Sequence, residues 1–85
     1  MPQLNSLFSY DNNLISIRYT IPYSSSIKLD AYDIKGKLFK VIADKFMQKG
    51  SYSVKWDSKR FGSGIYLLKL RVNGSKVSRK VTIIR

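Results

Sequence analysis

The sequence contains no cysteine, no histidine and no glutamate. Without cysteine, no disulfide can stabilise the fold and no thiolate can bind a metal. Without histidine, the commonest general base and the commonest metal ligand are both missing. The remaining carboxylates are five aspartates, and their spacing does not follow the D-x-D-x-D-G pattern of a calcium loop. We therefore expect a protein that is not an enzyme and that holds no metal and no cofactor.

Long apolar runs and glycine-rich loops are missing too. No segment reaches the roughly 18–20 apolar residues of a membrane helix. The opening MPQLNSLF has neither the basic nor the apolar region of a signal peptide, so we expect any export leader to lie upstream. The glycines are scattered rather than gathered in a phosphate-binding loop. A chain of 85 residues predicts one domain, 1–85, with a thin core.

What the sequence has in excess is positive charge: 16 basic side chains give a net charge of +11. Such a charge attracts an anionic partner, such as nucleic acid, an acidic polysaccharide, lipopolysaccharide or an acidic protein. It also keeps a small module soluble, which is the simpler interpretation. No nucleic-acid-binding motif accompanies the lysines, which argues against nucleic acid.

Apolar and polar residues alternate with a period of two over most of the chain, which predicts half-buried strands. A first strand and its turn at 11–13 occupy residues 1–13. Asn73-Gly74 is the strongest hairpin signal. Residues 43–49 either extend the strand before them or form an irregular connection. About seven short strands predict an all-β antiparallel sandwich. We expect them at 4–10, 14–21, 27–33, 38–42, 51–57, 64–72 and 75–85.

The alternation also predicts which charges share a face. Lys69 and Arg71 point away from the apolar side of their strand, and Lys76 and Lys80 share one parity on the last strand. The Asn73-Gly74 hairpin would join the two pairs into one cationic face. This face is a candidate site for an anionic partner, and an ordinary solvated face is the alternative.

Five short motifs follow one another between residues 15 and 85. They are ISIRYTIP at 15–22, IKLDAYDIKGK at 27–37, GSYSVKWD at 50–57, SGIY at 63–66 and RKVTIIR at 79–85. In this order they resemble the landmarks of the type IX secretion C-terminal sorting domain, over residues 14–85. The immunoglobulin-like domain of flagellar hook-capping proteins is similar. One departure is LFSY at 7–10, where the family often has P-N-P or N-P-F.

The resemblance implies an immunoglobulin-like β-sandwich that ends a larger exported protein, often a hydrolase or an adhesin. Such a non-catalytic domain directs its parent through the outer-membrane translocon of Bacteroidetes-type bacteria to the cell surface. The chain also resembles basic terminal domains of fibre-degrading bacterial hydrolases. The alternative function is therefore an ancillary module that attaches a parent hydrolase to an anionic or polysaccharide surface, including lipopolysaccharide. A purely structural role, as in hook capping, is a third.

The resemblance also singles out candidate sorting residues near the end of the chain. They are Gly64, Tyr66, Lys80, Val81, Ile83 and Arg85. For Gly64 and Tyr66 we favour a structural role, in which the glycine lets the backbone enter the strand and the tyrosine packs inside. Trp56 is expected in the core, although a sugar-stacking role for Trp56 or for a face of tyrosines stays open.

Overall fold

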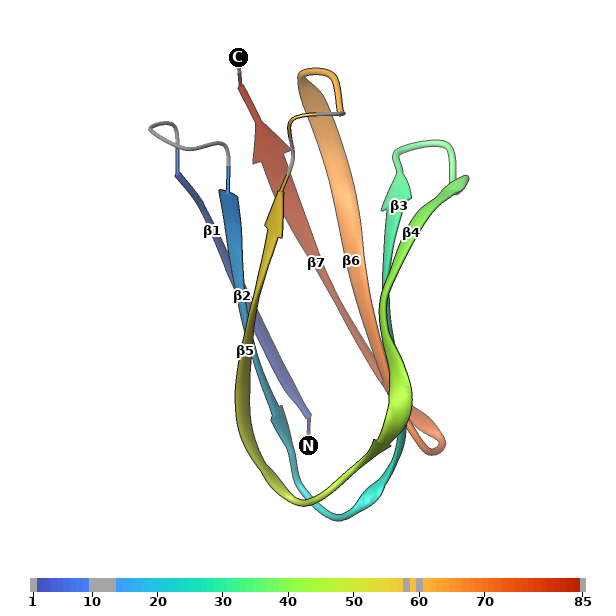
Figure 1. The fold of residues 1–85 in the computed structure, drawn as a ribbon. Coiled ribbons are helices and arrows are strands. Elements are labelled where there is room, and N and C mark those ends of the chain that lie inside the picture. The colour runs from blue at the N-terminus through green and yellow to red at the C-terminus, as the bar shows by residue number, and fades with distance from the viewer. Residues whose placement is uncertain (1, 10–13, 58, 60, 85) are drawn as a thin grey trace.

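Seven strands make up the computed structural model, which describes residues 2–9, 14–57, 59 and 61–84. The strands are β1 (Gln3–Ser9), β2 (Leu14–Ile21), β3 (Ser25–Asp33), β4 (Leu38–Met47), β5 (Gly50–Asp57), β6 (Gly64–Val72) and β7 (Ser75–Ile83). Sheet A has the order β1-β2-β5 and sheet B the order β4-β3-β6-β7. The two sheets face each other in Figure 1. The predicted antiparallel β-sandwich is confirmed.

The distribution of strands between the sheets is immunoglobulin-like. The first, second and fifth strands share one sheet, and the third, sixth and seventh share the other. In the constant-type immunoglobulin fold the fourth strand joins the first sheet, whereas here β4 pairs with β3. The apolar sequence of β6 suits its central place in sheet B, where it lies between β3 and β7.

The core lies between the two sheets and follows the predicted alternation. Ile15, Ile17 and Ile21 of β2 are fully buried, and so are Leu29 and Ala31 of β3. The buried apolar side chains are Leu4, Ile15, Ile17, Tyr19, Ile21, Ile27, Leu29, Ala31, Trp56, Tyr66, Leu68, Leu70, Val72, Val81 and Ile83. Because strands of both sheets contribute to this core, each sheet depends on the other to cover its apolar face.

Turn chemistry ends the strands where the sequence indicated it. Gly36 has φ +90° in the β3–β4 turn. The Asp33 carboxylate accepts hydrogen bonds from the backbone N–H groups of Lys35 at 2.9 Å and Lys37 at 2.8 Å. Aspartate therefore ends a strand by satisfying the backbone of the following turn. The predicted turn at 11–13 lies outside the described residues.

Of the two alternatives for residues 43–49, extension of the preceding strand is correct, since β4 runs to Met47. Its pairing with β3 shifts register twice, at Leu29/Asp30 and at Ala31/Tyr32. Such bulges bend an edge strand and hinder its pairing with another chain.

Candidate functional site

The last two strands form one antiparallel hairpin, β6–β7, joined by Asn73 and Gly74. Asn73 has φ 54°, a left-handed conformation that asparagine adopts more readily than most residues. The predicted Asn-Gly hairpin is therefore confirmed. Its register places Lys80 of β7 directly opposite Leu67 of β6, so both side chains lie on the outer face of sheet B.

Tyr66 ties the start of β6 to the loop before it. Its ring is buried, and its hydroxyl donates a 2.8 Å hydrogen bond to the Gly62 carbonyl oxygen. A tyrosine at this corner, bonded to backbone a few residues upstream, is typical of immunoglobulin-like folds. Gly64 lies between the two with φ +155°, which side-chain-bearing residues rarely adopt. The geometry gives both residues the structural role that we favoured.

The same arrangement occurs at the start of β5, where we had not predicted it. The Tyr52 hydroxyl donates to the Gln48 carbonyl oxygen at 2.7 Å, and Gly50 has φ +155°. Both corners share the pattern Gly-x-Tyr, which was visible in the sequence. The motifs at 50–57 and 63–66, on which the family resemblance partly rests, therefore each contain a Gly-x-Tyr corner that begins a strand.

Alternate residues near the end of β7 have opposite environments. Val81 is 5% exposed and Ile83 1% exposed, so both anchor the strand in the core. Lys80, between Arg79 and Val81, is exposed on the outside of sheet B. Arg85 lies outside the described residues. Of the sorting candidates described, Lys80 is therefore the one whose charged side chain faces solvent.

The four cations predicted to share a face do share the outer face of sheet B. Arg71 lies opposite Lys76, and Lys69 and Lys80 follow on the same side of the hairpin. Lys28 of β3 joins them opposite Arg71. Lys28, Arg71 and Lys76 thus form a row across three strands, in which like charges repel. We call these five residues the cationic face.

A buried carboxylate lies on the same side of sheet B as these cations and is covered by neighbouring side chains. Asp30 is 0% exposed, and its Oδ2 accepts a 3.0 Å hydrogen bond from the Tyr32 hydroxyl. Arg71 Nη2 lies 3.5 Å from Asp30 Oδ2 and donates to the Tyr32 hydroxyl oxygen at 2.8 Å. Lys69 Nζ sits 4.9 Å from the centre of the Tyr32 ring. Two of the predicted cations therefore also hold the fold together.

The hydroxyl of Tyr32 is perturbed by this environment. Burial, the hydrogen bond to Asp30 and the negative charge of Asp30 raise the pKa of Tyr32, while the Arg71 guanidinium acts in the opposite direction. The neutral tyrosine is therefore favoured, as its role as a donor to the carboxylate requires.

Trp56, Tyr19 and Tyr66 are buried, so these three rings do not offer a sugar-stacking face. Trp56 is 2% exposed and meets Phe61 edge to face at 4.8 Å between ring centres, so its predicted place in the core is confirmed. Tyr19 is buried and stacks on Tyr52 at 5.7 Å. Burial, with Tyr52 nearby, raises the pKa of Tyr19.

No group of three potential metal ligands comes together within the described part of the chain. That part also contains no helix with the length and apolar character to span a membrane.

Comparison with known proteins identifies one family. The family model described as "Secretion system C-terminal sorting domain" matches residues 11–84. The matched segment contains β2 to β7 and begins after β1. A search of curated proteins found no match.

Proposed function

Because this chain belongs to the family of secretion system C-terminal sorting domains, we propose that the secretion translocon recognises its β6–β7 hairpin. Domains of this family are non-catalytic and direct their parent protein by type IX secretion across the outer membrane to the cell surface. A hydrolase or an adhesin is the parent that we expect.

The observation that supports the hairpin is the contrast along β7. Val81 and Ile83 are buried and fix the strand, so a folded domain offers the translocon the opposite side. Lys80 is exposed on that side, and no carboxylate pairs with it among the described residues. An exposed lysine without an ion-pair partner contributes little to the stability of the fold. Its charge is available to bind an acidic receptor surface.

The test is export of a reporter that carries this domain at its C-terminus. Lys80→Ala should trap the reporter in the periplasm, while Lys55→Ala, an exposed lysine of sheet A, should leave export unchanged. Deletion of residues 81–85 should also block export, but it removes Val81 and Ile83 from the core, so the thermal stability of each variant has to be measured. Normal surface display of a folded Lys80→Ala variant would contradict the proposal.

A second function is supported by the cationic face itself, which lines up lysines and Arg71 across three strands. It would hold the parent on an anionic surface, such as an acidic polysaccharide or lipopolysaccharide. Retention of the domain on such a surface should fall steeply above about 0.1 M salt, where the Debye length is about 10 Å. Lys76→Gln with Lys80→Gln should reduce retention more than Lys40→Gln with Lys55→Gln. Equal effects would point to net charge alone.

A further inference from the structure

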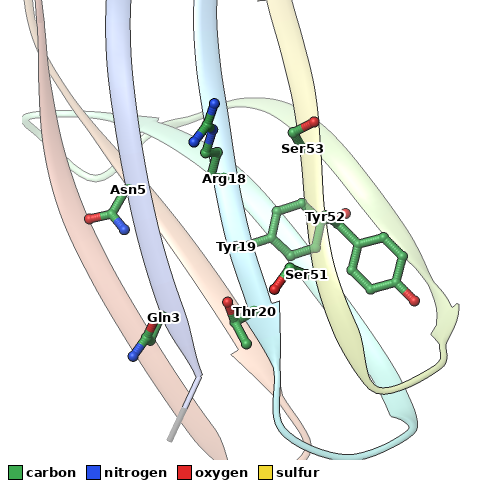
Figure 2. Close-up of a pocket in the computed structure, with 8 residues that line it drawn as sticks. All are labelled: Gln3, Asn5, Arg18, Tyr19, Thr20, Ser51, Tyr52 and Ser53. Carbon is green, nitrogen blue, oxygen red and sulfur yellow. The ribbon is translucent and has the colours of Figure 1, made fainter.

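The outer face of sheet A carries a polar hollow on the opposite side of the molecule from the cationic face. Its volume is about 440 Å³. Cross-strand register builds it in two rows, and Figure 2 shows the side chains on the three strands. The rows are Gln3, Thr20 and Ser51, and then Asn5, Arg18 and Ser53. We call these six residues the polar groove.

The side chains of the polar groove are available to a ligand. Arg18 and the amides of Gln3 and Asn5 are exposed. Arg71, not Arg18, makes the ion pair found among the described residues. Arg18 therefore lies between Asn5 on β1 and Ser53 on β5, and no carboxylate of the described residues pairs with its guanidinium.

We propose that the polar groove binds a saccharide unit that carries one carboxylate. An arginine side chain presents a planar fork of donors that matches a carboxylate with two parallel hydrogen bonds. The flanking amides and hydroxyls both donate and accept, as the hydroxyls of a sugar do. One cation among five neutral groups suits a monoanion better than a phosphate dianion.

The dimensions of the groove agree with this ligand. Rows two residues apart lie about 6.7 Å from each other along a strand, and neighbouring strands lie about 4.8 Å apart. The six side chains thus cover roughly 7 by 10 Å, which accommodates one or two sugar rings. Tyr19 and Tyr52 also line the hollow, but Tyr19 is buried in the core and Tyr52 packs against it, so the six outward side chains supply the polar groups. Orientation of the ligand therefore depends on Arg18.

The groove is separate from the β6–β7 hairpin, because its six residues lie on β1, β2 and β5, although four of them fall within the family match. Gln3 and Asn5 lie on β1, and the family match begins only at residue 11. Neither residue belongs to the motifs of the hairpin. Saccharide binding and export can therefore be tested independently on the same chain.

The experiment is titration of the 85-residue chain with trigalacturonate, followed by calorimetry and by backbone amide shifts. Amides of Thr20, Ser51 and Ser53 should shift on binding. Arg18→Gln should weaken binding at least tenfold, whereas Lys40→Gln, with the same charge change on β4 of sheet B and outside the cationic face, should change it less than twofold. Export of a reporter carrying Arg18→Gln should remain normal, which separates this site from the sorting function.

Several results would overturn the assignment. Equal affinity for neutral galactotriose would show that the carboxylate is not recognised. Equal losses in the Arg18 and Lys40 variants would indicate diffuse charge attraction rather than a site. Tighter binding of glucose 6-phosphate would assign the groove to phosphate. Absence of binding at low salt would remove the site altogether.

Discussion

Replacing the buried carboxylate under the cationic face tests how that face is held together. Asp30→Asn preserves the shape of the side chain and removes its charge. The amide oxygen of the new side chain can still accept from the Tyr32 hydroxyl, which lies 3.0 Å from Asp30 Oδ2 in the wild-type protein. What is lost is the attraction to Arg71, whose Nη2 lies 3.5 Å from that carboxylate oxygen.

The size of the loss follows from these contacts. A hydrogen bond to a charged group contributes about 1.5–3 kcal/mol, and a neutral one about 0.5–1.5 kcal/mol, so the exchange costs about 1 kcal/mol. The ion pair adds less than about 1 kcal/mol, because the Arg71 side chain is 45% exposed. We expect Asp30→Asn to lower the free energy of unfolding by about 1–2 kcal/mol. The corresponding fall in Tm is roughly 5–15 °C.

Denaturant and thermal unfolding of four proteins measure this: wild type, Asp30→Asn, Arg71→Gln and the double variant. Arg71→Gln should cost more than Asp30→Asn, because it leaves a fully buried charge without its cation. The double variant should cost less than the sum of the single changes. Asp44→Asn, an exposed carboxylate on β4, is the control and should change stability by less than about 0.5 kcal/mol. Additive costs, or an Asp30→Asn variant as stable as wild type, would refute the reasoning.

Four further predictions concern single residues. Tyr66→Phe should cost about 1 kcal/mol in an unfolding titration, because one hydrogen bond to the Gly62 carbonyl is lost. Gly64→Ala should cost about 1–3 kcal/mol in the same assay, because alanine is strained at φ +155°. Leu4→Ala should cost about 2–5 kcal/mol in thermal melts, since Leu4 is 1% exposed; little change would show that β1 is dispensable. The pKa of Tyr32 is higher in the folded protein than its value of 10.0 in the unfolded chain. The resulting stabilisation is complete below pH 10 and is lost as the pH rises through the pKa of the folded protein. Tyr32→Phe should therefore flatten the fall in Tm above pH 10.

The strands and their buried faces could be predicted because they depend on local alternation. Ile15 and Ile17 point inward for the same reason that Lys69 and Arg71 point outward: side chains of a strand alternate between its two faces. The Asn73-Gly74 turn is equally local, since asparagine and glycine allow the backbone to reverse within two residues.

The sequence did not reveal features that depend on which strands are neighbours. Lys28 joins the cationic face because β3 pairs with β6, and Asp30 is buried because Tyr32 and Arg71 contact it. Both facts require the sheet order, which alternation does not encode. The polar groove could not be predicted for the same reason. Asn5 and Ser53 are far apart in the chain, and the sheet order places them on the two sides of Arg18.

The proposed recognition of β7 would account for a motif in which apolar and basic residues alternate. A signal read from the folded domain needs a strand held in one register, and Val81 and Ile83 provide this because a shift by one residue would expose both to water. The same register fixes Lys80 on the outer face opposite Leu67. In the recognition that we propose, the apolar residues act through the position of the strand, and Lys80 acts directly. Loss of an apolar residue should impair export in proportion to lost stability, whereas loss of the lysine should impair export of a domain that remains folded.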